Sequence, residues 1–258
     1  MKKVIAFDLD GTLAPSKSNL PDRIAELLDE LLEYYQVCVI SGGKFGQFET
    51  QLIAGLKAEP SKLVRLHLLP TCGTQYYTYD ITKLVWKQVY AENFNDIEKK
   101  QITSALEKGI DELGYHEKKV YGDIIEDRGS QITFSALGQD VISVLGEDGV
   151  QLKKEWDPTT EKKNKLRDAI AAKIPEFEVR VGGETSIDIT KPGIDKAYGI
   201  HKLMTILELG KDDILFFGDR LAEGGNDYPV KAMGVDSIEV SHWQDTARVL
   251  EGIIHVSR

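Results

Sequence analysis

Two aspartates follow a short apolar run near the start of the chain. Residues 4–7 read Val-Ile-Ala-Phe, and Asp8, Asp10 and Gly11 lie within the next four positions. If the run is a buried strand, Asp8 lies at the carboxyl edge of a parallel sheet, where open α/β sheets bind ligands, and the pleat brings Asp10 to the same side. Such a pair can hold Mg²⁺ through oxygen ligands, and one carboxylate can attack phosphorus. An acidic β-turn is the alternative interpretation, because Asp-Gly is a common turn dipeptide.

A second apolar run, residues 37–40, leads into Ser41, Gly42 and Gly43. A small hydroxyl and two glycines at a strand end allow backbone N–H groups to come close to a phosphate. The same composition suits a plain strand-to-helix turn, so this segment alone leaves both interpretations open.

Two more candidate segments lie towards the end of the chain. Lys196 stands at the start of an expected helix, and the fully apolar run 214–217 leads to Asp219. Asn226 and Asp227 follow a short loop later and offer further oxygen atoms. Crowded carboxylates repel one another, so a divalent cation would stabilise them. A nearby lysine would neutralise phosphoryl oxygens during an in-line transfer.

The elements that must position these groups change character along the chain. In the first and last parts, apolar strands alternate with amphipathic helices, which predicts an α/β fold with a parallel sheet. Between them, alternating strand patterns such as residues 131–136 are mixed with helices, which is typical of an antiparallel α+β module. We therefore expect a core of residues 1–87 and 187–258 and an inserted cap of residues 88–186.

The composition excludes several classes of function. Lys and Arg number 32 against 42 Asp and Glu, and the net charge of −10 argues against nucleic acid or an anionic membrane as the main partner. No apolar run approaches the length of a membrane span, and Asp8 interrupts the first one too early for a signal peptide. The two cysteines do not indicate a disulfide framework. We expect a cytoplasmic protein with a small-molecule substrate, and any homodimer is expected to form through the cap.

Taken together, these segments resemble the four motifs of the haloacid dehalogenase (HAD) superfamily. The motifs are Asp-Leu-Asp-Gly-Thr at residues 8–12, Ser41, Lys196, and residues 218–227 with their Gly-Asp and Asn-Asp pairs. The resemblance implies a HAD-like, Rossmannoid parallel-sheet core with an inserted α+β cap. Along nearly its whole length the chain also resembles the eukaryotic-type phosphomannomutases, most clearly at residues 182–188 and 216–227.

This resemblance implies a role for each matching residue. Asp8 would be the nucleophile that forms an aspartyl-phosphate, Asp10 the general acid and base for the sugar hydroxyl, and Lys196 a catalytic cation. The implied cofactor is Mg²⁺, and the residues expected around it are Asp8, Asp10 (through its carbonyl), Asp219, Asn226 and Asp227. The residues expected to bind the phosphates and the sugar are Lys17, Ser41, Gly42, Gly43, Arg128, Gln139, Lys154, Ser186 and Asp188.

The positions expected to hold the non-reacting phosphate depart from the phosphomannomutase pattern. Arg128 matches an arginine of that family, Lys17 and Lys154 replace two others, and Gln139 replaces a fourth. Lysine keeps the charge but loses the bidentate fork, and glutamine loses the charge. The leading hypothesis is Mg²⁺-dependent interconversion of hexose 6-phosphate and hexose 1-phosphate, and the alternative is a sugar-phosphate phosphatase. A non-catalytic sugar-phosphate sensor is disfavoured, because no core residue of the motifs is missing.

Overall fold

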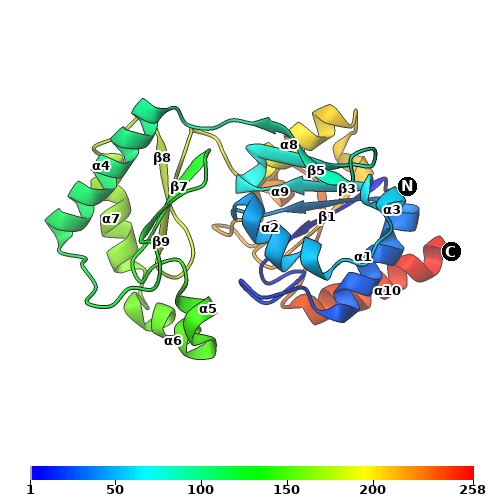
Figure 1. The fold of residues 1–258 in the computed structure, drawn as a ribbon, viewed down its shortest axis with the longest axis horizontal. Helices are drawn as coiled ribbons and strands as arrows, with labels where there is room; N and C mark the ends of the chain where they lie inside the picture. The colour runs from blue at the N-terminus through cyan, green and yellow to red at the C-terminus, as the bar shows by residue number, and fades with distance from the viewer. Residues whose placement is uncertain (1) are drawn as a thin grey trace. The chain divides into compact units, whose positions relative to one another are not determined.

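The computed structural model describes residues 2–258, which divide into two compact units. Unit 1 comprises Met1–Ala91 and Ile194–Arg258, and unit 2 comprises Glu92–Gly193. Each unit has a sheet of its own, as Figure 1 shows. Each also has a hydrophobic core of its own. The chain therefore has an α/β fold in which the first unit is interrupted by the second.

Unit 1 is built on a seven-stranded sheet with the order β11-β10-β1-β2-β3-β4-β5 (Figure 1). Its strands are β1 (Val4–Asp8), β2 (Gln36–Ile40), β3 (Leu66–Leu69), β4 (Gln75–Asp80), β5 (Val85–Ala91), β10 (Ile214–Gly218) and β11 (Asp236–Glu239). Neighbours from β11 to β3 pair in parallel, and β4 and β5 extend the sheet as an antiparallel hairpin. The carboxyl ends of the parallel strands therefore meet at one edge.

Helices of unit 1 pack on both faces of this sheet. They are α1 (Asp22–Tyr34), α2 (Phe45–Gln51), α3 (Pro60–Leu63), α8 (Lys196–Ile206), α9 (Tyr228–Ala232) and α10 (Trp243–Ser257). Ile5 and Phe7 of β1 belong to the buried cluster that contains α1 and α10. Val4 and Ala6 belong to a second cluster that contains α8 and α9. Because β1 is buried on both faces, its sequence is continuously apolar.

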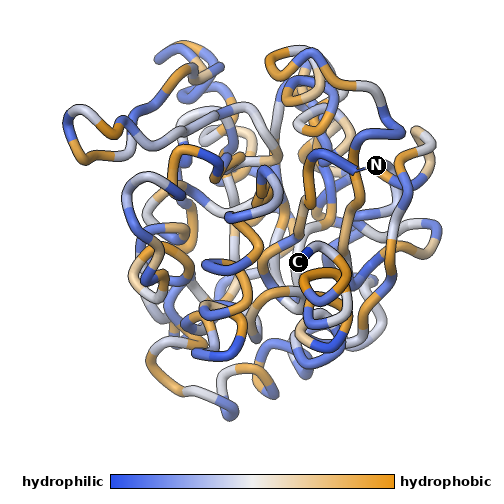
Figure 2. The backbone as a smooth tube through the Cα atoms, turned by 90° about the vertical axis from the view of Figure 1, so that its right-hand side faces the viewer, coloured by the Kyte–Doolittle hydropathy of each residue, from blue (hydrophilic) through white to orange (hydrophobic). Residues whose placement is uncertain are grey.

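The last helix, α10, shows how one stripe of a sequence anchors an element. Ala247, Leu250 and Ile254 are buried at helical spacing, and Thr246 beside them is fully buried as well. Figure 2 shows the matching alternation of hydrophobic and hydrophilic residues along the helix that leads to the C-terminus. This periodicity is the pattern of an amphipathic helix with one face on the core.

Unit 2 is an antiparallel four-stranded sheet, of order β6-β7-β9-β8, with helices. Its elements are α4 (Asp96–Leu113), β6 (Ile125–Asp127), β7 (Gln131–Ser135), α5 (Val141–Leu145), α6 (Glu147–Trp156), α7 (Glu161–Ala171), β8 (Glu178–Val181) and β9 (Ser186–Thr190). Phe134 and Ile187 pack with α4 and α7, whereas Thr133 and Asp188 on the alternate positions form a polar face. The alternating sequence patterns thus correspond to one apolar face, packed on the helices, and one polar face.

Both expected domain boundaries differ by a few residues from the limits of the two compact units. Position 87 falls inside β5, which belongs to unit 1 through Ala91. Position 187 falls inside β9, which pairs with β7 and β8 and therefore belongs to unit 2. A boundary cannot cross a paired strand, because its ladder of backbone hydrogen bonds lies within one sheet.

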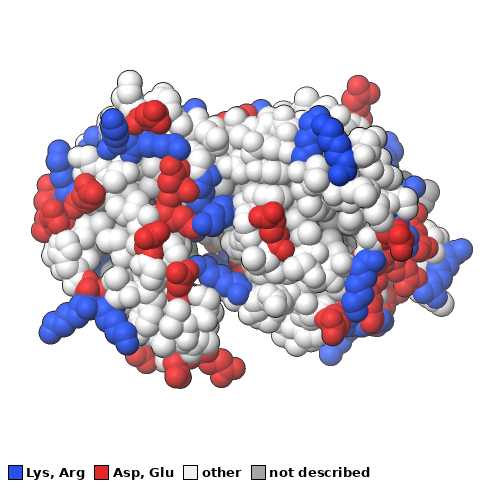
Figure 3. Space-filling model, viewed as in Figure 1, with Lys and Arg blue, Asp and Glu red and all other residues white. Residues whose placement is uncertain are grey.

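The described part of the chain, residues 2–258, contains no helix that is both long and apolar enough to cross a membrane. On the face in Figure 3, basic and acidic side chains are intermingled over both units.

Candidate active site

Three carboxylates meet at the carboxyl edge of the parallel sheet. Asp8 is the last residue of β1, and Asp219 comes directly after the neighbouring parallel strand β10. Asp227 lies at the N-terminal end of α9. One oxygen from each of these side chains lies within 4.8 Å of the other two. The fold thus brings together three of the expected metal ligands, although more than 200 residues of sequence separate the first from the others.

A buried lysine ties two of these carboxylates together. Lys196 is the first residue of α8, and its Nζ donates to Asp8 Oδ1 at 2.5 Å and to Asp227 Oδ1 at 2.6 Å. Only 1% of Lys196 is exposed. The helix begins here because the side chain of Asp195 accepts a hydrogen bond from the N–H of Tyr198, as an N-cap residue does.

The site carries more negative charge than its lysine balances. Burial raises the pKa of Asp8 to about 7, Lys196 opposes this shift, and Asp227 adds to it. Burial, followed by repulsion from Asp227, also raises the pKa of Asp219. For Lys196, burial disfavours the charge, but its two carboxylate partners outweigh burial and raise its pKa. A second cation at this edge would relieve the excess.

The donor set fits Mg²⁺. All three side chains of the cluster offer oxygen, Asp8 and Asp227 are buried, and Asp219 is partly exposed. Mg²⁺ binds few carboxylates and keeps other positions for water and substrate phosphate, so a partly open cluster suits it. Asn226 lies on the exposed loop just before Asp227, where it is the most accessible of the expected ligands.

Two glycines allow the carboxylates to come this close. Gly11 has a φ of 90°, and a Cβ there would lie 2.5 Å from Asp219 Oδ2. A Cβ on Gly218 would lie 2.6 Å from Asp227 Oδ2. Side chains at either position would push a carboxylate out of the cluster.

The position of Asp10 differs from the expected one. β1 ends at Asp8, so no pleat carries Asp10 to the same side, and Asp10 lies in the turn that follows. Its Oδ1 accepts hydrogen bonds from the Lys17 backbone N–H at 2.7 Å and from Gln51 Nε2 at 2.9 Å. Its Oδ2 accepts one from Gln47 Nε2 at 2.9 Å. The Asp10 carboxylate is thus held by these donors rather than in the three-carboxylate cluster.

Sequence reasoning missed Gln47 and Gln51. Their i, i+4 spacing on the helix directly after Ser41–Gly43 places them on one face, and this signal was available. It is a weak signal, because two glutamines at helical spacing are more often solvent-exposed than functional.

The glycine-rich loop follows β2, as expected. Ser41 is 4% exposed, and its Oγ accepts a hydrogen bond from the Gly43 N–H at 3.1 Å. Thr12 is fully buried, and its hydroxyl has no hydrogen-bond partner among residues 2–258. The Thr12 carbonyl accepts a hydrogen bond from Thr246 Oγ1 of α10 at 2.7 Å, a contact that the sequence did not suggest. Lys17 is exposed on the loop that leads to α1.

The remaining expected site residues belong to unit 2. Arg128 donates to Glu126 Oε2 at 2.7 Å and to Gln139 Oε1 at 3.4 Å, so the structure brings Arg128 and Gln139 together. Asp188 and Ser186 lie at alternate positions of β9, on its polar face. Lys154 is an exposed residue of α6.

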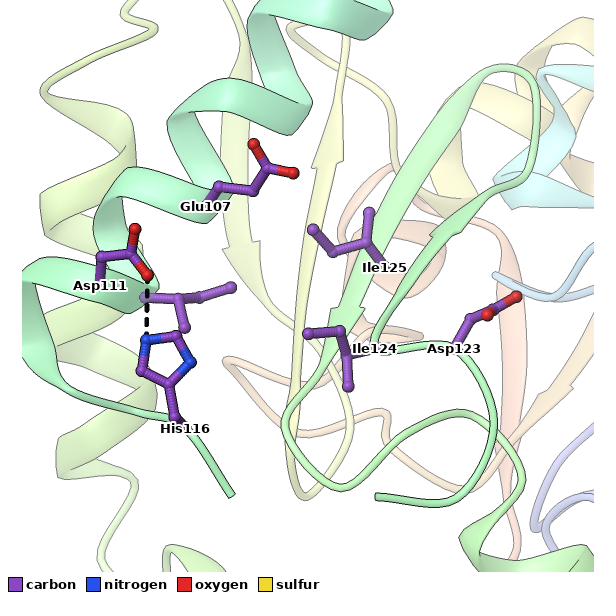
Figure 4. Close-up of a pocket in the computed structure, with 7 residues that line it drawn as sticks. Glu107, Asp111, His116, Asp123, Ile124 and Ile125 are labelled. Carbon is purple, nitrogen blue, oxygen red and sulfur yellow. Dashed lines mark ion pairs between the residues drawn. The ribbon is translucent and has the colours of Figure 1, made fainter. Parts of the chain in front are cut away.

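Unit 2 also has a pocket between α4 and the start of β6, which Figure 4 shows. Glu107, Asp111 and Asp123 give it an acidic rim, and His116 Nε2 lies 2.9 Å from Asp111 Oδ1. A phosphate ester needs cations, whereas the one basic group of this pocket faces a carboxylate. The carboxylate and lysine cluster of unit 1 therefore matches the chemistry that the motifs indicate better than this pocket does.

Comparisons with known proteins show which family the chain is similar to. The family model of haloacid dehalogenase-like hydrolases matches residues 5–229. The phosphomannomutase of Encephalitozoon cuniculi is 24% identical over 253 residues, covering 97% of this chain and 93% of that protein. The probable phosphomannomutase of Caenorhabditis elegans is 23% identical over 261 residues, covering 98% and 96%.

Solved structures share the fold at low identity. Plasmodium falciparum IMP-nucleotidase superimposes with a TM-score of 0.71 at 17% identity, covering 99% of this chain and 69% of that one. A trehalose-6-phosphate phosphatase related protein gives a TM-score of 0.61 at 16% identity, covering 98% of both chains. The chain belongs to the haloacid dehalogenase-like hydrolase family. It is an enzyme of the HAD superfamily, with homologues named phosphomannomutase and with nucleotidases and phosphatases among its structural neighbours.

Proposed function

We propose that this enzyme transfers phosphoryl groups on hexose phosphates through a phosphorylated Asp8 and with Mg²⁺ as cofactor. The observation that carries the proposal is the ion triad of Asp8, Lys196 and Asp227 beside Asp219. It presents a buried carboxylate nucleophile next to a fixed cation at the open edge of a sheet. When bound, Mg²⁺ would be held by Asp8, Asp219 and Asp227 and would neutralise charge on the transferring group.

In this reaction each residue of the site has a separate role. A carboxylate oxygen of Asp8 attacks phosphorus, the bond between phosphorus and the sugar oxygen breaks, and that oxygen takes a proton from Asp10. Lys196 stabilises the charge on the phosphoryl oxygens, and the backbone N–H groups near Ser41 orient them. In the second half-reaction an incoming hydroxyl attacks the aspartyl-phosphate and gives its proton to Asp10.

The acceptor of the second half-reaction separates two candidate activities. In the mutase that we favour, the acceptor is a hydroxyl of a hexose monophosphate, so a hexose bisphosphate is formed and exchanges its two ends. Full-length similarity to proteins named phosphomannomutase supports this reading. In a phosphatase the acceptor is water, and the fold's likeness to a nucleotidase and a phosphatase-related protein supports that second candidate.

The two candidates are separated by following both products at once. We expect the enzyme to convert hexose 1-phosphate to hexose 6-phosphate, which ³¹P NMR can monitor. A catalytic amount of hexose 1,6-bisphosphate should stimulate this conversion. A slow release of inorganic phosphate should accompany it, because a cap that opens during exchange admits some water. A chelator should stop both processes.

Three outcomes would count against the proposal. If phosphate release exceeds isomerisation on every hexose phosphate and hexose 1,6-bisphosphate has no effect, the enzyme is a phosphatase and not a mutase. If nucleotides are hydrolysed in preference to hexose phosphates, the substrate class is wrong. If activity survives chelation, the metal assignment is wrong.

A further inference from the structure

Three hydrogen-bond donors surround the carboxylate of Asp10. Lys17 supplies its backbone N–H, and Gln47 and Gln51 supply their side-chain amides, at distances of 2.7 to 2.9 Å. Gln47 Nε2 also donates to Gln51 Oε1 at 2.7 Å, so the two amides are joined to each other as well as to Asp10. Because both carboxylate oxygens have partners, the plane of the carboxylate is fixed.

One of the two glutamines, Gln47, contacts Asp10 and also lies against the glycine-rich loop. Both lie on α2, one turn apart, and Gln51 is 3% exposed. A Cβ on Gly43 would lie 2.0 Å from Gln47 Oε1, so the Gln47 amide occupies the space that any larger residue at position 43 would fill. The loop expected to hold the phosphoryl group is therefore packed against the amide that holds the expected acid and base.

We propose that Gln47 and Gln51 are positioning residues that fix Asp10 for proton transfer to and from the sugar oxygen. This inference rests on the proposed function, in which Asp10 is the general acid and base. Asp10 lies in a turn beyond the end of β1, so the strand does not orient its side chain. The amides supply the orientation, and a carboxamide suits this task because its N–H groups bond a carboxylate and its oxygen can bond a carboxylic acid.

The leaving group provides a readout that a purely structural role would not change. A sugar oxygen is a poor leaving group and needs a proton from Asp10, whereas p-nitrophenolate leaves without one. Loss of Asp10 orientation should therefore slow phosphorylation of Asp8 by hexose 1-phosphate and spare its phosphorylation by p-nitrophenyl phosphate.

The experiment uses Gln47→Leu and Gln51→Leu, which remove the amides and keep most of the volume. In rapid-quench single turnovers with hexose 1-phosphate, we expect each variant to be slowed about 100-fold, the scale of general acid catalysis. The burst of p-nitrophenolate should stay within about threefold of wild type, because that step needs no proton transfer. Asp10→Asn should show the same selective loss, and Glu49→Gln on the exposed side of α2 should show none.

Thermal unfolding of every variant checks the fold, and Gln47→Leu is the safer variant because Gln47 is only partly buried. Equal losses on both esters would show a structural role and overturn the inference. Unchanged rates on both esters would overturn it too. A wild-type enzyme that is inactive on both would overturn the proposed function and this inference with it, whereas an active wild type with insensitive variants would leave the proposed function standing.

Discussion

The surroundings of Asp8, the proposed nucleophile, disfavour its charge. Burial raises its pKa to about 7 even though Lys196 donates a hydrogen bond to it. A carboxylate that is poorly solvated is a better nucleophile than one that water stabilises, but it must be ionised to act. A cation beside Asp219 and Asp227 would provide that ionisation, so metal binding and activation of Asp8 are expected to go together.

Replacing Asp8 tests whether its carboxylate oxygen is the nucleophile. Asp8→Asn keeps the shape of the side chain but cannot attack phosphorus, so we expect phosphoryl transfer to fall at least about 1,000-fold. Without divalent cation at pH 8, the unfolding temperature should stay equal or rise, because the buried charge with its raised pKa is gone. Activity within about tenfold of wild type, only ~1.4 kcal/mol in the barrier, would refute the assignment.

Gly11 tests the packing that closes the carboxylate cluster. Gly11→Ala places a Cβ 2.5 Å from Asp219 Oδ2 at a backbone φ of 90°, so Asp219 must move. We expect weaker Mg²⁺ binding by calorimetry and at least a tenfold loss of activity, about 1.4 kcal/mol. Gly114→Ala is the matched control, since Gly114 has a φ of 66° but no atom within 4 Å of the added Cβ. Equal effects of the two variants would mean that backbone strain alone is responsible.

Strands and helices position these residues, and most of those elements could be predicted from the sequence. The apolar runs before Asp8, Ser41 and Asp219 identified three parallel strands and their common edge, because a strand buried on both faces has little choice of residue. What the runs could not show is which groups hold Asp10 beyond the end of β1. β1 ends at Asp8, so Asp10 depends on amides from another helix, and such a contact follows from tertiary packing rather than from local periodicity.

His67 links three neighbouring strands of unit 1. It lies on β3, is 4% exposed, and its ring nitrogens are 2.7 Å from the Tyr76 hydroxyl on β4 and 2.7 Å from Gln36 Oε1 on β2. Burial lowers its pKa to about 4. The folded protein therefore keeps His67 neutral at a pH where the unfolded chain would bind a proton.

The sign of the pH effect follows from that difference. Below the unfolded pKa of about 6.5, protonation stabilises the unfolded chain, so stability falls as the pH drops from about 6.5 to about 4. Between pH 7.5 and pH 5.0 we expect wild type to lose about 2 kcal/mol more than His67→Gln, which lacks the titrating group. Denaturant unfolding at both pH values measures this difference. Equal losses in the two proteins would mean that His67 is protonated in the fold.

At the scale of the whole molecule, the expected inserted module, residues 88–186, differs from unit 2, Glu92–Gly193, at both ends. β9 alternates isoleucines with Ser186 and Asp188, a pattern typical of an antiparallel strand with one open face. β10 is apolar throughout, as a central parallel strand should be. The contrast between these two patterns could have placed the boundary after β9. The pairing of β9 with β7 and β8 could not be predicted from the sequence, because strand pairing depends on residues that are far apart in the chain.

The residues expected to react and the residues expected to bind the second phosphate belong to different units. Asp8, the proposed nucleophile, and Lys196 are in unit 1, and Arg128, which stands where a phosphate-binding arginine is expected, is in unit 2. Arg128 and its partner Glu126 are only 12% and 16% exposed, so the guanidinium is held in place. A rigid, charged donor suits recognition of the phosphate that does not react.

Arg128→Ala should therefore raise KM for hexose phosphates about tenfold or more, since a charge-assisted hydrogen bond contributes ~1.5–3 kcal/mol. Hydrolysis of p-nitrophenyl phosphate should stay within about twofold, because that ester has no second charged group for Arg128 to bind. Arg180→Ala is the matched control, because Arg180 lies on the same sheet, pairs with Glu178 and is 40% exposed. Steady-state kinetics of both variants on hexose phosphate and on p-nitrophenyl phosphate measures these effects. If Arg128→Ala and Arg180→Ala behave alike, or if Arg128→Ala slows both esters equally, Arg128 has a structural role and the distal phosphate is recognised elsewhere.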